Sequence, residues 1–332
     1  MAIHNKSHNN SALRSILKKN KDNLKNKTSV DFKMPEKSIS LLFNEDCVKA
    51  LKKIPDESIQ LILIDPPYNL DLADWDTYEN YMEWAGTWLD EAYRVLSKSG
   101  SLVIFGGTQF RNERSGDLTE IIYHCRHNTK WKLVNTIIWY YKNGMSAHRY
   151  FANRHEEVIW LVKTDKYYFD LDSVRVKYSP EELKNALKDK RLIPENVIKG
   201  KNPTNVWEIG RLNGNSLERV GHPTQKPLEI IRRFVKSLSY PGAVVLDFFA
   251  GSGTTGRICI EEGRHCIMID NDKQSQVYFK KHLENMSQTN LKKEYNRVKT
   301  INEFFEDVNS LDNKWCHLIK WLFLISNCFV KK

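Results

Sequence analysis

The chain has 332 residues, of which 41% are hydrophobic and 28% charged, and its mean hydropathy is -0.55; this composition is typical of a folded globular protein. Lysine and arginine total 51 against 41 for aspartate and glutamate, so the formal net charge is +10, which favours a polyanionic partner such as nucleic acid. The opening MAIHNKSHNN lacks the apolar core of a signal peptide, and the longest near-apolar run, Trp321 to Val330, is too short to cross a bilayer. We therefore expect no membrane association.

Cysteine spacing bears on metal binding and on cellular compartment. The chain has six cysteines and no C-x-x-C pair, which argues against a zinc site and against the disulfide framework of a small secreted protein. We expect free thiols, no bound metal and a cytoplasmic location.

The N-terminal segment differs in composition from the rest of the chain. Residues 1–37 are rich in asparagine, lysine and serine, with nine basic residues against three acidic ones. This composition predicts a flexible basic arm. Such an arm either contacts nucleic acid or is an inert solvated tail, and the residues alone leave both interpretations open.

From Ile39 onward, short apolar runs alternate with an amphipathic stretch. Continuous apolar runs are typical of parallel strands buried on both faces. Between the second and third runs, apolar residues recur every three or four positions from Tyr81 to Leu96, which predicts a helix and hence an α/β sheet. The predicted strands are residues 41–43, 59–64 and 101–105, with two further β-like runs at 134–141 and 157–163.

The second half of the chain first interrupts this pattern and then resumes it. Residues 170–221 are rich in lysine, asparagine, proline and glycine, with little apolar periodicity, and indicate an inserted recognition region. Pro227 then opens a predicted helix, and strands follow at 243–248 and 265–269. The segment 303–332 has the pattern of an amphipathic helix, and its purpose does not follow from the sequence.

A glycine-rich turn follows the predicted strand 243–248, in VVLDFFAGSGTTG. Gly251 and Gly253 allow backbone to approach a ligand at a helix N-terminus, and Gly256 completes G-x-G-x-x-G. Asp270 ends the next strand, at the distance where nucleotide-binding folds place an acid on ribose hydroxyls. The motif fits NAD or S-adenosylmethionine, and a turn needed only for close packing is the structural alternative.

The segment IQLILIDPPYNL places Asp65, Pro66, Pro67 and Tyr68 at the carboxyl end of a predicted buried strand, where open α/β sheets bind ligands. Asp65 and the Pro66 carbonyl can each accept one hydrogen of an exocyclic amine while Tyr68 stacks on the ring that bears it. The alternative is a proline-rich loop in which Asp65 caps a helix. The buried strand and the glycine turn together favour the binding role.

These motifs resemble a known family, the amino-methylating DNA methyltransferases that use S-adenosylmethionine. DPPY is similar to the family's catalytic motif, DFFAGSG to its cofactor motif, and HPTQKP (222–227) to a third element. Because DPPY comes first and HPTQKP lies between, the order resembles that of the family's β group. The resemblance implies a Rossmann-like α/β methyltransferase sheet in circularly permuted order, with an inserted target-recognition region. Cutting the sheet after Asp270 and restarting at Leu41 would leave strand neighbours unchanged.

Matched residue by residue, the resemblance implies two groups of site residues. The catalytic group is Asp65, Pro66, Pro67 and Tyr68. The cofactor-binding group is Asp46 and Cys47 near the adenine; Asp270 on the ribose; His222, Thr224 and Lys226 near the methionine carboxylate and ribose; and Asp247, Phe249, Ala250, Gly251, Ser252 and Gly253 at the turn. Cationic Lys226 agrees with charge pairing, whereas Cys47 is equally well explained as a small buried filler.

The resemblance also implies a division of the chain by role. The predicted parts are the arm (1–37), a catalytic half (38–110), the remaining strands with the target-recognition region (111–221), a cofactor-binding half (222–292) and a C-terminal extension (293–332). Basic residues between Arg175 and Arg219 could meet phosphates and base edges.

From about residue 44 to 270 the similarity is densest to an adenine-N6 member of the family that methylates the inner adenine of GAATTC. The resemblance therefore implies duplex DNA as substrate, a flipped-out adenine as target, and a restriction-modification setting with a companion endonuclease. A homodimer is a further expectation.

Three alternatives stay open at this point. Methylation of the cytosine N4 amine poses the same chemical problem, although Asp65, rather than serine, resembles the adenine enzymes more closely. A nicotinamide-dependent oxidoreductase would use the glycine turn but leaves DPPY and HPTQKP unexplained. A DNA-binding module with a vestigial cofactor fold is disfavoured by the intact Asp65 and Asp270.

Overall fold

The structure is a computed structural model that describes residues 32, 34–69, 78–107, 118–144, 146–149, 151–287 and 295–312. All helices and strands described below belong to one compact unit that begins at Met34. The predicted basic arm lies almost wholly outside the described residues, as do the last twenty residues of the predicted C-terminal helix, 313–332. No helix in the described ranges is long and apolar enough to span a bilayer.

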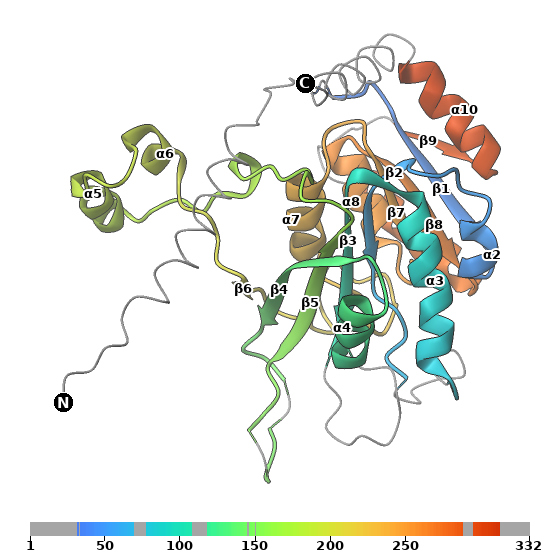
Figure 1. Ribbon diagram of the computed structural model, residues 1–332, viewed down its shortest axis with the longest axis horizontal. Coiled ribbons are helices and arrows are strands. Elements are labelled where there is room, and N and C mark those ends of the chain that lie inside the picture. Colours follow the sequence, from blue (N-terminus) through green and yellow to red (C-terminus); the bar gives the residue numbers. More distant parts are fainter. Residues whose placement is uncertain are drawn as a thin grey trace. The chain divides into compact units, whose positions relative to one another are not determined.

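A nine-stranded sheet forms the centre of this unit, with strand order β6-β4-β5-β3-β2-β7-β8-β1-β9 in the described residues (Figure 1). Its strands are β1 (Ser38–Asn44), β2 (Ile59–Ile64), β3 (Leu96–Gly106), β4 (Lys132–Tyr140), β5 (His155–Val162), β6 (Val206–Glu208), β7 (Val244–Asp247), β8 (His265–Asp270) and β9 (Tyr295–Val298). β5 is antiparallel to both its neighbours, and the other neighbouring strands pair in parallel. The α/β sheet predicted from the apolar runs is confirmed.

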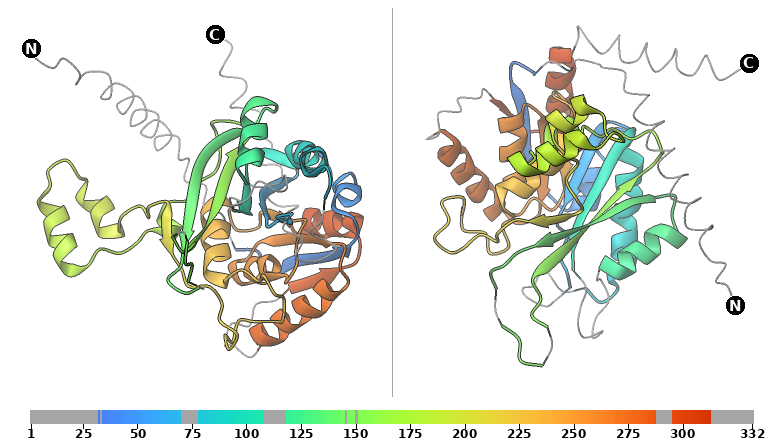
Figure 2. Two further views of the ribbon diagram at one scale, coloured as in Figure 1. Left: turned by 90° about the horizontal axis from the view of Figure 1, so that it is seen from below. Right: turned by 90° about the vertical axis from the view of Figure 1, so that its left-hand side faces the viewer.

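Helices cover both faces of the sheet and produce three layers (Figure 2). Alternation along β2 shows why both faces must be covered, because Ile62 and Ile64 enter one core and Leu61 and Leu63 the other. The first core is closed by α2 (Cys47–Leu51), α3 (Tyr81–Val95), α4 (Leu118–His127) and α10 (Ile301–Asp312). The second is closed by α7 (Leu228–Leu238), α8 (Thr254–Glu262) and α9 (Gln274–Ser287).

β1 and β8 are direct neighbours although more than 200 residues separate them in sequence. They pair in parallel, with Asn44 opposite Asp270. The permuted order requires this pair. A permutation that cuts the chain after β8 and restarts it at β1 leaves all strands in place, so β8 and β1 must remain neighbours. The Ile39 N–H also donates to His265 Nδ1 at 3.0 Å, which fixes the amino ends of the two strands.

The segment 170–221 contains more regular structure than its composition predicts. It forms the short 3-10 helix η2 (Asp172–Val174), α5 (Pro180–Lys188), α6 (Pro194–Lys199) and strand β6. α5 begins with a capping box between Ser179 and Glu182, and no α5 residue is buried. Apolar periodicity was weak because α5 and α6 pack on each other and project away from the sheet (Figures 1 and 2).

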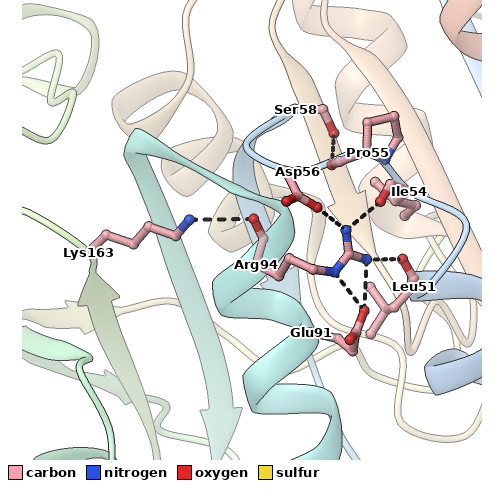
Figure 3. A network of polar contacts seen from close by, with 8 residues as sticks. All are labelled: Leu51, Ile54, Pro55, Asp56, Ser58, Glu91, Arg94 and Lys163. Atoms are coloured by element: carbon pink, nitrogen blue, oxygen red, sulfur yellow. Dashed lines mark hydrogen bonds and ion pairs between the residues drawn. The ribbon is translucent and has the colours of Figure 1, made fainter.

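Arg94 near the end of α3 joins three segments on the first face of the sheet (Figure 3). Its guanidinium donates to the carbonyls of Leu51 at 2.8 Å and Ile54 at 2.9 Å, where α2 has ended. It also contacts the carboxylates of Glu91 at 2.7 Å and Asp56 at 2.5 Å. The guanidinium therefore adds a second donor to the Leu51 carbonyl, which also accepts the Ile54 N–H, and it fixes the end of α2 against α3.

We expect Arg94→Met to lower the free energy of unfolding by about 1–3 kcal/mol, because two carbonyls lose charge-assisted donors. Urea titration measures this change. Arg126 is exposed on α4, and Arg126→Met is the matched control, with an expected change within about 0.5 kcal/mol. Equal stabilities of the two variants would show that the Arg94 contacts contribute nothing.

Candidate active site

Four neighbouring parallel strands, β2, β7, β8 and β1, end at one edge of the sheet. The chain continues from them into Asp65, Phe248, Asn271 and Glu45 respectively. A cavity of about 410 Å³ lies at this edge and is lined by both the DPPY segment and the glycine turn. The sheet topology therefore joins motifs that are about 180 residues apart in sequence.

The DPPY segment is held by hydrogen bonds on each side of the prolines. The Tyr68 hydroxyl donates to Asp65 Oδ1 at 2.7 Å, and the Tyr81 hydroxyl of α3 donates to the Pro67 carbonyl at 2.8 Å. Asn69 adopts a positive φ of 55° and its side chain exchanges hydrogen bonds with the Tyr78 backbone at 2.8 and 3.1 Å. No helix begins at residues 66–69, so the helix-capping interpretation of Asp65 is wrong.

Lys226 forms the shortest ion pair in the cavity, with its Nζ 2.6 Å from Asp65 Oδ2 and 3.5 Å from Glu156 Oε2. Its side chain is only 10% exposed. Burial by itself lowers the pKa of Lys226, but the carboxylates of Asp65 and Glu156 raise it above its ordinary value. The resemblance placed Lys226 near the methionine end of a cofactor, whereas here its ammonium lies against the predicted catalytic carboxylate.

Two carboxylates organise the glycine turn. Asp270 accepts the Gly251 N–H at 2.7 Å and the Asp272 N–H at 2.8 Å. Asp247 accepts the Thr255 hydroxyl at 2.7 Å; burial raises its pKa to about 7, against the lowering effect of this hydrogen bond. Gly251 has a φ of +46°, and a Cβ there would lie 3.1 Å from the His222 ring. Glycine is therefore required where the turn meets the HPTQKP segment.

Gly253 meets a packing requirement within the glycine turn. It has a φ of +78°, and a Cβ there would lie 2.9 Å from the Phe279 Cβ of α9. Gly253 is absent from the cavity lining. This glycine therefore meets a packing requirement of the turn on α9, and its role toward a ligand stays a prediction.

The remaining cofactor candidates lie on the cavity wall. Asp46 caps α2 by accepting the Lys49 N–H at 3.0 Å. Cys47 is buried, and burial raises the pKa of its thiol to about 12, which leaves no thiolate for nucleophilic chemistry. His222 packs edge-on against Tyr278, and burial lowers the pKa of its imidazole. The Thr224 hydroxyl lies 3.4 Å from His222 Nδ1.

The structure thus brings every predicted site residue except Gly253 to one cavity. These are Asp46, Cys47, Asp65, Pro66, Pro67, Tyr68, His222, Thr224, Lys226, Asp247, Phe249, Ala250, Gly251, Ser252 and Asp270. The lining also includes Phe105, Trp139 and Glu156, which the sequence did not single out, and Arg211, which it grouped with the basic residues of the recognition region.

Comparison with known proteins identifies the family. The N6_N4_Mtase family, described as DNA methylase, matches residues 59–281. The chain belongs to this DNA methylase family. The match covers the DPPY segment, HPTQKP, the glycine turn and Asp270, and it decides against the nicotinamide-dependent alternative.

Curated relatives agree with this assignment. The methylase is 33% identical over 270 residues to the Type II methyltransferase M.HpaI of Haemophilus parainfluenzae, which covers 79% of this chain and 77% of that protein. It is 32% identical over 237 residues to the DNA adenine methyltransferase YhdJ of Escherichia coli K12, covering 69% and 77%.

Solved structures share the fold. The PvuII DNA methyltransferase, described as cytosine-N4-specific, superposes with a TM-score of 0.56 at 18% identity and covers 82% of this chain and all of that one. The TTHA0409 protein of Thermus thermophilus, described as a putative DNA modification methylase and solved with S-adenosylmethionine, superposes with a TM-score of 0.53 at 22% identity and covers 79% of this chain and 98% of that one. The methylase therefore has the Rossmann-like fold of this class.

The packing role of Gly253 is testable on the methylase itself. We expect Gly253→Ala to lower the free energy of unfolding by about 2–4 kcal/mol, because alanine is strained at this φ and its Cβ meets Phe279. Gly210→Ala is the matched control, since no heavy atom lies within 4 Å of an added Cβ there. Urea titration distinguishes them, and a Gly253→Ala variant as stable as Gly210→Ala would contradict the packing role.

Proposed function

We propose that this methylase is a site-specific DNA adenine-N6 methyltransferase that uses S-adenosylmethionine and acts on a flipped-out adenine in duplex DNA. The observation that carries the proposal is the shared cavity, in which Asp65 at the end of β2 lies beside the glycine turn of the adjacent strand β7. An amine held at Asp65 would therefore lie next to a cofactor held at the turn.

The cavity residues fit S-adenosylmethionine. The Asp270 carboxylate accepts hydrogen bonds from two backbone N–H groups, and its remaining lone pairs can accept hydrogen bonds from ribose hydroxyls. Asp46 and Cys47 would lie at the adenine, and His222, Thr224 and Lys226 near the methionine carboxylate and ribose. When bound, S-adenosylmethionine supplies a methyl group on a positively charged sulfur.

The DPPY segment would prepare the target amine. Asp65 and the Pro66 carbonyl would each accept one amine hydrogen, which favours a pyramidal nitrogen with a localised lone pair. Tyr68 and Lys226 hold the Asp65 carboxylate at 2.7 and 2.6 Å, yet each oxygen keeps a second lone pair for this purpose. Fixed near-attack geometry of this kind contributes on the order of 7 to 11 kcal/mol to lowering the barrier.

Adenine rather than cytosine is supported by Asp65 at the first position of the motif and by the dense similarity to the RsrI adenine methyltransferase. The adenine-specific E. coli relative agrees. The cytosine-N4 enzyme among the solved structures shares the fold at 18% identity, which does not bear on the base. We accordingly place the methylated amine on the inner adenine of GAATTC.

Target recognition would fall to residues 111–221, where α5 and α6 project from the sheet (Figure 1). Flipping a base out of a duplex costs a few kcal/mol, and stacking on Tyr68 would offset part of this. The proposal also includes a restriction-modification setting in the cytoplasm, a companion endonuclease for the same site and a homodimer.

Asp65→Asn keeps the side-chain shape but removes the charge that accepts the amine hydrogen. We expect methyl transfer to fall by at least about 100-fold, while the affinity for S-adenosylmethionine stays within about threefold, because the turn holds the cofactor. A tritium-transfer assay and calorimetry on one preparation measure both. Asp90→Asn on the exposed side of α3 is the control. Retention of most of the activity by Asp65→Asn would remove Asp65 from the mechanism.

The target is tested by expressing the protein in a host that lacks adenine methylation and sequencing its DNA with a modification-sensitive long-read method. We expect N6-methyladenine at the inner adenine of GAATTC, because each mismatched base pair costs about 1–3 kcal/mol. Modified adenine in another motif would contradict the site, and modified cytosine would contradict the base as well.

A further inference from the structure

Glu156 is a carboxylate in an unfavourable position. It stands on β5 opposite Trp139 of β4, and the next residues on the same strand face, Val158 and Trp160, are core residues. Its Oε2 is buried and has no hydrogen-bond partner in the described part of the chain, although the Lys226 ammonium lies 3.5 Å away as an ion pair. A buried acceptor left in this state costs about 1–3 kcal/mol, which favours a functional reason for its presence.

The surroundings of the Lys226 ammonium show what this position can hold. Two carboxylates, Asp65 and Glu156, contact the nitrogen, so their nearest oxygens lie within about 6.1 Å of each other. The ring centroids of Tyr68 and Phe105 lie 5.7 and 5.5 Å from the same nitrogen, a distance at which ring faces attract a cation. The four groups form a pocket for a positively charged nitrogen.

This pocket borders the place where the proposed function puts the target amine. That amine must lie against Asp65, one of the two carboxylates. Within ion-pair distance the cluster has two carboxylates and one ammonium, and the guanidinium of Arg211 acts on Glu156 from further away. Arg211, Tyr68 and Tyr141 are the other titratable groups that interact with Glu156.

We propose that Glu156 is a second catalytic carboxylate of the methyl transfer, which with Asp65, Tyr68 and Phe105 stabilises the positive charge that forms on the target amine. The inference rests on the proposed function and extends it. The Lys226 nitrogen lies in this pocket, which shows that the pocket accepts a cationic nitrogen.

The chemical step balances with these groups. The amine lone pair forms the new N–C bond to the methyl carbon, and the electron pair of the breaking C–S bond stays on sulfur. The nitrogen then carries one positive charge and loses one proton to a carboxylate of the pair. Burial raises the pKa of Glu156 above its usual value, against the opposing effect of Lys226, which makes this carboxylate a better proton acceptor than an exposed one.

Glu156→Gln tests the proposal, with Glu157→Gln as a matched control. Glu157 is the next residue on β5, pairs with His155 at 3.0 Å and does not line the cavity. In single-turnover transfer at saturating DNA and cofactor, we expect Glu156→Gln to be slower by on the order of 10- to 100-fold and Glu157→Gln to stay within about twofold of the wild type. Fluorescence anisotropy should show unchanged duplex affinity for both variants.

A binding measurement supplies a readout independent of turnover. Sinefungin carries an ammonium where S-adenosylmethionine carries its methyl group, whereas S-adenosylhomocysteine carries no charge there. We expect Glu156→Gln to weaken sinefungin binding by on the order of tenfold in calorimetry and to leave S-adenosylhomocysteine binding unchanged. If Glu156→Gln unfolds at a lower temperature than the wild type, Glu156→Asp takes its place. This variant keeps the carboxylate but retracts it by one methylene, so it should retain an intermediate rate and part of the preference for sinefungin.

The outcomes separate this inference from the function on which it rests. A wild-type protein that methylates no DNA contradicts the proposed function. An active wild type with Glu156→Gln within twofold of its rate, or with equal losses for both cofactor analogues, overturns the role of Glu156 alone.

Discussion

The ion pair between Lys226 and Asp65 is the interaction on which the site depends. It joins residues 161 positions apart, one at the end of β2 and the other just before α7, and both side chains are largely buried. Isolated charges in such a setting are costly, and a buried pair is stable only when geometry and neighbouring groups are favourable. The Tyr68 hydroxyl on Asp65 and the second carboxylate, Glu156, provide those neighbours.

Sheet topology explains why the pair can form. β2 and β7 are hydrogen-bonded parallel strands, so the segments after them leave the sheet side by side, as expected where ligands bind in open α/β sheets. The permuted chain order does not disturb this arrangement, because β8 and β1 lie next to each other as they would in an unpermuted chain. A DNA methylase of this family can therefore carry its DPPY segment before its glycine turn without a change in the site.

Local sequence patterns predicted those parts of the fold that depend on interactions between residues close together in the chain. The apolar run at 59–64 became β2 with the same bounds, and the glycine turn after β7 follows the backbone freedom of glycine, with a positive φ at Gly251. Glu156 was missed because its strand is antiparallel. The amino end of β5 reaches the edge where the parallel strands have their carboxyl ends, and strand direction is decided by pairing that no local pattern reveals.

Other differences have the same origin in long-range contacts. Lys226 was assigned to the cofactor by resemblance, and only the folded chain shows it between two carboxylates. Gly253 fits the ligand-binding motif, and the position of Phe279 on α9 adds a packing requirement that the motif does not contain. A motif fixes residue types and spacing, whereas the partner of each residue depends on which elements the topology places opposite it.

A double-mutant cycle between Asp65→Asn and Lys226→Met measures the central ion pair most directly. Each single variant and the double variant are unfolded in urea, and the coupling free energy is the part of the change that is not additive. The structure predicts a coupling of about 1–3 kcal/mol, because the pair is close and largely shielded from water. A coupling below about 0.3 kcal/mol would mean that the two changes are independent, and it would contradict the arrangement in which Lys226 holds the Asp65 carboxylate.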